Sequence, residues 1–170
     1  HPLDAEVVVV GIRGERRVPL TEFLVGFYQT ALAPDELITG LVAPALPDPA
    51  GATYLKYSSR TAEDRPCVGV AAVALPEPDG TCRELRVAVG AAAEVPQRFP
   101  ELEAAAVSGP LDDAAVDALA DGYAERIDPI ADVRGSAWYR TEMVRVWVGR
   151  AVRAARAAAE QRATPEGALR

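Results

Sequence analysis

The fold is decided by residues 68–90, which read Val68-Gly-Val-Ala-Ala-Val-Ala-Leu75, then Pro76-Glu-Pro-Asp-Gly80, then Thr-Cys and Arg83-Glu-Leu-Arg-Val-Ala-Val-Gly90. The first piece is a continuous run of small apolar residues. In the last piece large apolar residues alternate with polar or small ones, which is typical of a strand. The prolines, aspartate and glycine between the two pieces favour a turn. With a further strand candidate at 53–60, the pattern predicts a three-stranded antiparallel meander.

The sequence after the meander predicts helices. Pro100 suits the first turn of a helix to about residue 107, a second helix is expected over 111–127, and Ser136 can cap a long third helix to about residue 162. The third helix is amphipathic. Its expected polar stripe is Glu142, Arg145, Gly149, Arg153, Arg156 and Glu160, and its apolar stripe is Val144, Trp147, Val148, Ala151 and Ala155. Three strands followed by helices predict an α+β domain with one face of the sheet covered by helices.

A smaller set of elements is expected before the meander. They are a hairpin of strands at 6–11 and 15–19, a short helix at 22–28 capped by Thr21, and a strand at 36–39. Three prolines fall within residues 43–49, and this makes the segment the best candidate for a linker.

Composition excludes several classes of function. The formal net charge of −7 argues against a general nucleic-acid binder, which needs clustered Lys and Arg. No apolar run is long enough to span a membrane, and the first residues do not resemble a signal peptide, so a cytoplasmic protein is expected. The single histidine, His1, leaves a stand-alone hydrolase or a metal enzyme without its usual groups. Cys67 and Cys82 have apolar neighbours and are interpreted as two buried free thiols, with a disulfide as the alternative.

The unusual stretch runs from Tyr54 to Val70. It places the only lysine, Lys56, in a strand and follows it with a loop that contains Arg60 and Asp64. One interpretation is an ordinary polar hairpin whose surface ion pairs contribute little. The other is a charged loop beside a ligand.

An ordered series of motifs resembles the flavin subunits of carbon monoxide dehydrogenase and xanthine dehydrogenase-type molybdenum hydroxylases. The motifs are Asp35-Glu-Leu-Ile38, the proline-rich linker, Tyr54-Leu-Lys-Tyr-Ser-Ser-Arg60, Val68-Gly-Val-Ala-Ala72, Ile127-Asp-Pro-Ile-Ala-Asp-Val-Arg-Gly-Ser136 and Tyr139-Arg140. The resemblance extends from about residue 5 to about residue 160. It implies that residues 1–43 are the C-terminal remnant of an FAD-binding lobe and that residues 44–170 are the flavoprotein C-terminal domain.

The resemblance also implies a site, a cofactor and partners. Lys56, Arg60 and Asp64, with Tyr57 adjacent, correspond to the family's residues beside the isoalloxazine ring. A cation or hydrogen-bond donor there stabilises reduced flavin. The chain is expected to hold FAD weakly or not at all without the N-terminal FAD-binding lobes, and to be inactive alone. Its implied partners are a molybdopterin large subunit and an iron–sulfur small subunit, within an oxidoreductase that transfers electrons. The alternative is a non-catalytic binding or scaffold module that keeps the fold without flavin.

Overall fold

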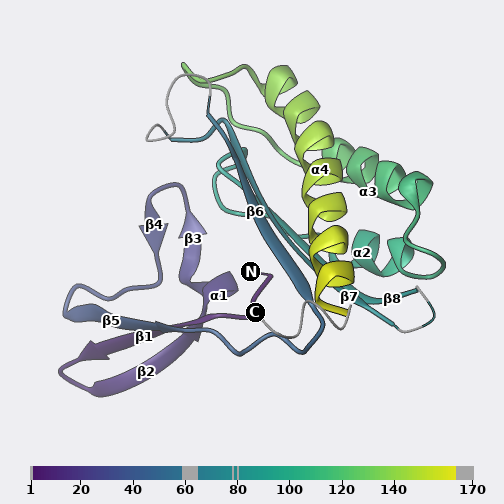
Figure 1. Ribbon diagram of the computed structural model, residues 1–170. Coiled ribbons are helices and arrows are strands. Elements are labelled where there is room, and N and C mark those ends of the chain that lie inside the picture. Colours follow the sequence, from purple (N-terminus) through teal and green to yellow (C-terminus); the bar gives the residue numbers. More distant parts are fainter. Residues whose placement is uncertain (1, 59–64, 78, 80, 164–170) are drawn as a thin grey trace. The chain divides into compact units, whose positions relative to one another are not determined.

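The structure is a computed structural model that describes residues 2–58, 65–77, 79 and 81–163. The chain divides into two compact units, His1–Leu46 and Pro47–Arg170, each described here by itself. Figure 1 shows the first unit in purple to blue and the second from blue through teal and green to yellow.

The first unit is a small sheet with short appendages. Strand β1 (Glu6–Gly11) pairs on one side with β2 (Gly14–Pro19) and on the other with β5 (Glu36–Val42), and both pairings are antiparallel. In sequence, α1 (Leu20–Phe23) and a short hairpin of β3 (Leu24–Gly26) and β4 (Gln29–Thr30) lie between β2 and β5. Its small core consists of Val7, Val9, Val18 and Phe23.

The expected helix at 22–28 is wrong. Only the four residues of α1 are helical, and Thr21 does not cap them, because α1 begins after Pro19 and has no side-chain cap. At Leu24 the backbone becomes extended, and β3, which begins there, pairs with β4. Tyr28 has a positive φ of 56°, which suits a turn and not a helix. The hairpin pairing therefore outweighs the apolar helical spacing that favoured a helix.

The second unit has the predicted α+β architecture. Strands β6 (Gly51–Tyr57), β7 (Val68–Pro76) and β8 (Cys82–Gly90) form an antiparallel meander in that order, and α2 (Pro100–Ala106), α3 (Asp113–Arg126) and α4 (Ala137–Ala163) follow. The predicted cap of α4 is confirmed, because the Ser136 hydroxyl accepts the Tyr139 backbone N–H at 3.1 Å. Helix α3 is capped by Asp112, whose carboxylate accepts the Ala115 N–H at 2.9 Å.

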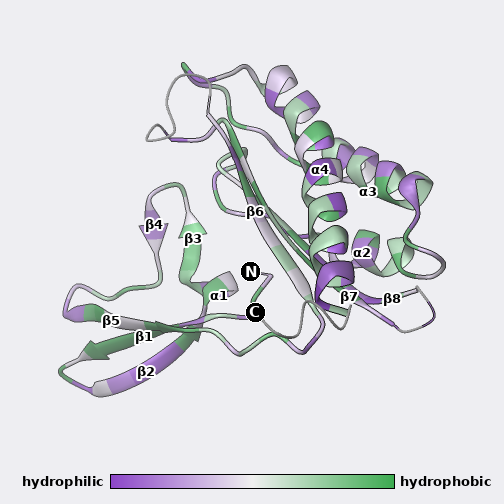
Figure 2. Cartoon of the chain, in the orientation of Figure 1, coloured by the Kyte–Doolittle hydropathy of each residue, from purple (hydrophilic) through white to green (hydrophobic). Residues whose placement is uncertain are grey.

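Helix α4 lies along the meander and supplies much of the core (Figure 1). Its buried face carries Val144, Val148, Val152 and a series of alanines, and hydrophobic and hydrophilic bands alternate along it in Figure 2. The small residues permit a close approach: a Cβ at Gly51 would lie 2.1 Å from the Ala155 carbonyl oxygen. One residue of the expected polar stripe, Gly149, is buried instead.

A buried carboxylate joins the meander to α2 and α3. Glu103 is 3% exposed and accepts the Val87 backbone N–H at 2.7 Å and the Arg98 guanidinium at 2.9 Å. The Tyr123 hydroxyl lies 3.1 Å from the same carboxylate, and burial, followed by this negative charge, raises the pKa of Tyr123 above its usual range. A buried charge with this many partners is a structural element rather than an exposed reactive group.

Both cysteines are free and buried, as predicted. None of the helices in the described part of the chain combines the length and apolarity that a bilayer crossing needs.

Candidate functional site

Two predicted site residues, Lys56 and Tyr57, lie at the C-terminal end of β6 and point to opposite faces of the meander. Side chains of a strand alternate in direction, so Tyr54 and Lys56 share one face while Leu55 and Tyr57 share the other. Leu55 and Tyr57 pack against the core beneath the helices, whereas Tyr54 and Lys56 are exposed on the opposite, outward face. Lys56 and Tyr57, although adjacent in sequence, therefore face different surroundings.

On the outward face of the described strands, the residues in register with Lys56 and Tyr54 are small. Across the three strands, Lys56 is in register with Gly69, and Gly69 with Gly90. The next outward row is formed by Tyr54, Ala71 and Ala88. A Cβ at Gly69 would lie 2.7 Å from the Tyr54 hydroxyl, which places the Tyr54 ring over this glycine. In the described part of the chain, these two rows thus bring together the Lys56 ammonium group, the Tyr54 ring and small residues.

Tyr54 is a residue that the interpretation of the sequence did not single out. The signal that could have identified it is the two-residue spacing from Lys56, because residues i and i+2 of a strand share a face.

Tyr57 is held from the helical side. Its hydroxyl lies 2.6 Å from the Tyr139 hydroxyl, and its ring stacks on Trp147 with centroids 5.2 Å apart. This hydrogen bond, followed by burial, raises the pKa of Tyr139. Trp147 packs against the core as its place on the apolar stripe predicted. The contact fixes the last residue of β6 to α4.

The other two predicted residues, Arg60 and Asp64, lie outside the described residues. The described chain resumes at Arg65, and Cys67 donates its backbone N–H to the Tyr57 carbonyl oxygen at 2.7 Å. This bond joins the end of β6 to the residue that precedes β7. The two ends of segment 58–66 are therefore brought together beside Lys56.

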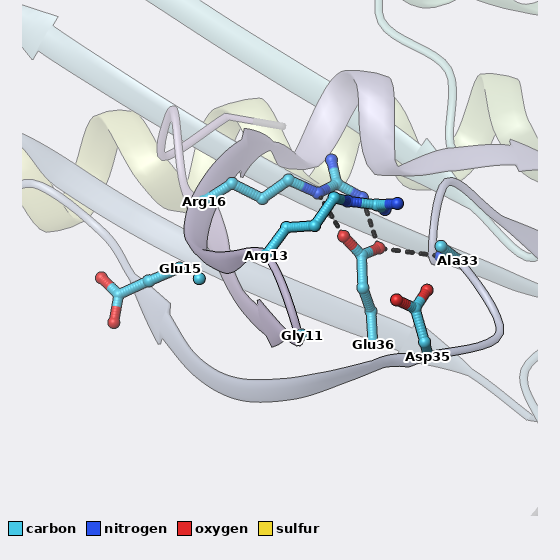
Figure 3. Close-up of a pocket in the computed structure, with 8 residues that line it drawn as sticks. Gly11, Arg13, Glu15, Arg16, Ala33, Asp35 and Glu36 are labelled. Atoms are coloured by element: carbon cyan, nitrogen blue, oxygen red, sulfur yellow. Dashed lines mark hydrogen bonds and ion pairs between the residues drawn. The ribbon is translucent and has the colours of Figure 1, made fainter.

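A second feature lies in the first unit, where a hollow of about 180 Å³ is lined by residues of the β1–β2 turn and the start of β5. Glu36 accepts two hydrogen bonds from Arg16, at 2.8 and 2.7 Å, and one from the Ala33 N–H at 2.8 Å. The Arg16 bonds, and then the Ala33 bond, lower the pKa of Glu36 to about 2. Figure 3 shows both Arg13 and Arg16 extending toward this carboxylate. Because Glu36 is paired with Arg16, we interpret this contact as one that holds β2 to the start of β5.

Within residues 2–58, 65–77, 79 and 81–163, no three His, Cys, Asp or Glu side chains gather as metal ligands would. At the Lys56 face, a cation and an aromatic ring lie beside small residues, and these groups suit a planar ligand that carries negative charge.

The second unit is similar to a known domain family. Residues 53–169 match the family model described as the CO dehydrogenase flavoprotein C-terminal domain. The chain is 32% identical to the 6-hydroxypseudooxynicotine dehydrogenase complex subunit alpha of Paenarthrobacter nicotinovorans, over 87% of this chain and 50% of that protein. It is 29% identical to the xanthine dehydrogenase FAD-binding subunit of Escherichia coli O157:H7, over 92% of this chain and 53% of that protein.

Solved structures give the same result. The carbon monoxide dehydrogenase of Hydrogenophaga pseudoflava, in a form that lacks the Mo-pyranopterin moiety of its molybdenum cofactor, superposes with a TM-score of 0.86 at 32% identity. The match covers 92% of this chain and 54% of that one. The chain spans about half the length of the curated relatives it matches. The family match covers the meander and its helices, and the chain belongs to the CO dehydrogenase flavoprotein C-terminal domain family.

Proposed function

We propose that this chain is the C-terminal part of the FAD-binding subunit of a cytoplasmic molybdenum hydroxylase-type oxidoreductase. Residues 44–170 form the flavoprotein C-terminal domain, and residues 1–43 complete an FAD-binding lobe. The observation that carries the proposal is the position of Lys56. It is the only lysine of the chain. It is exposed beside small residues on the outward face of the meander, in a domain that belongs to a flavoprotein family.

The residues present fit one wall of a flavin site. A planar ring can pack against another aromatic ring and small side chains, and the Tyr54 ring over Gly69 and the neighbouring Ala71 supply these beside Lys56. Lys56 would donate a hydrogen bond and a positive charge at the edge of the ring, which favours the reduced form. Arg60 and Asp64 are proposed to contact the flavin from the segment that follows, and Tyr57 to support that segment from beneath the strand.

The rest of the flavin site is proposed to come from other parts of the assembly. FAD, when bound, would pass electrons from iron–sulfur clusters to an acceptor. The pyrophosphate would be held by N-terminal FAD-binding lobes, because a pyrophosphate is best bound by a glycine-rich turn at a helix N-terminus, and this sequence has no glycine-rich turn that leads into a helix. The proposed partners are a molybdopterin large subunit and an iron–sulfur small subunit. The chain would have no catalytic nucleophile or base and would be inactive alone.

The test is the FAD content of two forms of the protein. The complete subunit, in which two FAD-binding lobes precede this chain, should purify yellow with about one FAD per subunit. The chain alone should show no tight FAD site in titration calorimetry. A colourless complete subunit that fails to take up added FAD would contradict the proposal and favour a scaffold that keeps the fold without flavin.

A further inference from the structure

Two adjacent residues in the first turn of α4 contact both strands that border segment 58–66. Tyr139 contacts Tyr57, the last residue of β6, and Arg140 contacts Cys67, which immediately precedes β7. These contacts span 82 and 73 residues of sequence, so they join parts of the chain that only the fold brings together. Figure 1 shows the N-terminal end of α4 and this end of β6 on the same side of the second unit.

On the β6 side, two contacts hold Tyr57. Its hydroxyl lies 2.6 Å from the Tyr139 hydroxyl, and its ring stacks on Trp147. Together they determine where the β6 backbone ends, one residue after Lys56.

The contact on the β7 side is a buried guanidinium. Arg140 is 1% exposed and donates to the carbonyl oxygens of Cys67 and Ala91, the latter at 2.7 Å, while its second amino group pairs with Asp132. Ala91 follows β8 and has a positive φ of 64°, an uncommon conformation for a residue with a Cβ. One side chain thus binds the backbone at the ends of two strands and a loop before α4.

We propose that Tyr139 and Arg140 are positioning residues, which hold the ends of β6 and β7 together and thereby set the geometry of the wall that carries Lys56. The inference has two parts. The structural part, that the two residues hold the strand ends together, concerns the chain itself. The functional part, that this affects bound FAD, rests on the proposed function, and the two parts are tested separately. Neither residue is placed to touch the flavin, because Tyr57 and its helical partners lie on the side of the meander opposite to Lys56.

The structural part is tested with the two buried cysteines of the chain. Cys67 is 1% exposed and directly bonded to Arg140, whereas Cys82 begins β8 at the opposite end of the meander. Thiol labelling resolved by mass spectrometry then separates local opening from global unfolding. Arg140→Met should accelerate labelling of Cys67 by tenfold or more and leave the rate at Cys82 within about twofold.

The matched control is Arg153→Met on the same helix, whose side chain makes exposed ion pairs with Asp113 and Asp117. It should leave both labelling rates at the level of the unmodified chain. If Arg140→Met accelerates both cysteines in parallel, or neither, Arg140 does not hold this end of the meander and the inference is wrong. Tyr139→Phe, which removes a single hydroxyl, should accelerate Cys67 alone by about threefold and serves if Arg140→Met does not fold.

The functional part is tested by the redox midpoint potential of FAD in the complete subunit. Tyr139→Phe should shift this potential, while Arg153→Met, which removes exposed ion pairs from the same helix, should not. An unchanged potential in Tyr139→Phe would overturn the positioning role. A complete subunit that binds no FAD at all would instead refute the proposed function, and the cysteine labelling would still decide whether the two residues hold the strand ends.

Discussion

Replacing Gly51 with alanine tests the packing of α4 on the meander directly. A Cβ at this position would lie 2.1 Å from the Ala155 carbonyl oxygen and 2.3 Å from the Ala159 nitrogen. Both are backbone atoms, so no side-chain rotation relieves the overlap, and the helix must move outward by roughly 1 Å. A gap of this size forfeits about a quarter to a half of each dispersion contact along the interface.

The expected loss follows from these contacts. Overpacking a well-packed core costs about 1–3 kcal/mol, and two simultaneous backbone overlaps place Gly51→Ala near the upper end. The gain from a stiffer unfolded chain, about 0.4–1 kcal/mol, offsets part of it. We expect a net loss of roughly 2 kcal/mol, a large part of the roughly 5–15 kcal/mol that a domain has.

Urea unfolding followed by far-ultraviolet circular dichroism measures the effect. The matched control is Gly109→Ala, because a Cβ at Gly109 meets no atom within 4 Å. Its midpoint should stay close to that of the unmodified chain. Equal midpoints for Gly51→Ala and Gly109→Ala would show that α4 does not lie on the start of β6, and the account of the core would fail.

Three further predictions follow from other contacts of the fold. Glu103→Ala removes the carboxylate that accepts the buried Val87 N–H and the partly buried Arg98 guanidinium, so unfolding in urea should show a loss of about 1–3 kcal/mol; a loss below about 1 kcal/mol would refute the buried network. Arg16 lowers the pKa of Glu36 from 4.5 to about 2. The ionised Glu36 side chain therefore contributes its full stabilisation above about pH 4.5, and this stabilisation disappears as the pH falls toward 2. Glu36→Gln should flatten this part of the pH dependence of unfolding, and an unchanged profile would contradict the assignment. Trp147→Ala should cost about 2–3 kcal/mol, since the ring is half-buried against Tyr57, whereas Arg153→Ala should cost less than about 1 kcal/mol; equal midpoints would place the wrong face of α4 inward.

The parts of the fold that depend on local signals could be predicted from the sequence. The strands at 68–76 and 82–90 follow from an apolar run, an alternating run and a turn between them, all within 23 residues. The start of α4 follows from Ser136, whose hydroxyl caps the helix one residue before it begins. Caps and periodicity act over a few residues, so a single sequence contains them in full.

Features that depend on distant partners could not be predicted. The burial of Glu103 requires Arg98, Tyr123 and the backbone of β8 around one carboxylate. The need for glycine at position 51 is visible only when α4, more than 100 residues later, lies against it. Tyr57 illustrates an intermediate case: strand alternation already separates it from Lys56, but its hydroxyl partner comes from the last helix.

The central claim is that Lys56 supplies a positive charge at the flavin. The most direct test is the redox midpoint potential of FAD in the complete subunit, compared between the unmodified protein and Lys56→Met. A unit charge about 4 Å from the ring, at an effective dielectric constant near 20, contributes up to about 4 kcal/mol, and about 1.4 kcal/mol corresponds to 30 mV for a two-electron couple.

Solvent around the exposed lysine reduces this contribution, so removing the charge should lower the potential by roughly 30–60 mV. Arg83→Met is the matched control, since Arg83 is an exposed cation at the opposite end of the meander, and it should leave the potential unchanged. A potential in Lys56→Met equal to that of the unmodified subunit would contradict the claim that this face of the meander is a wall of the flavin site.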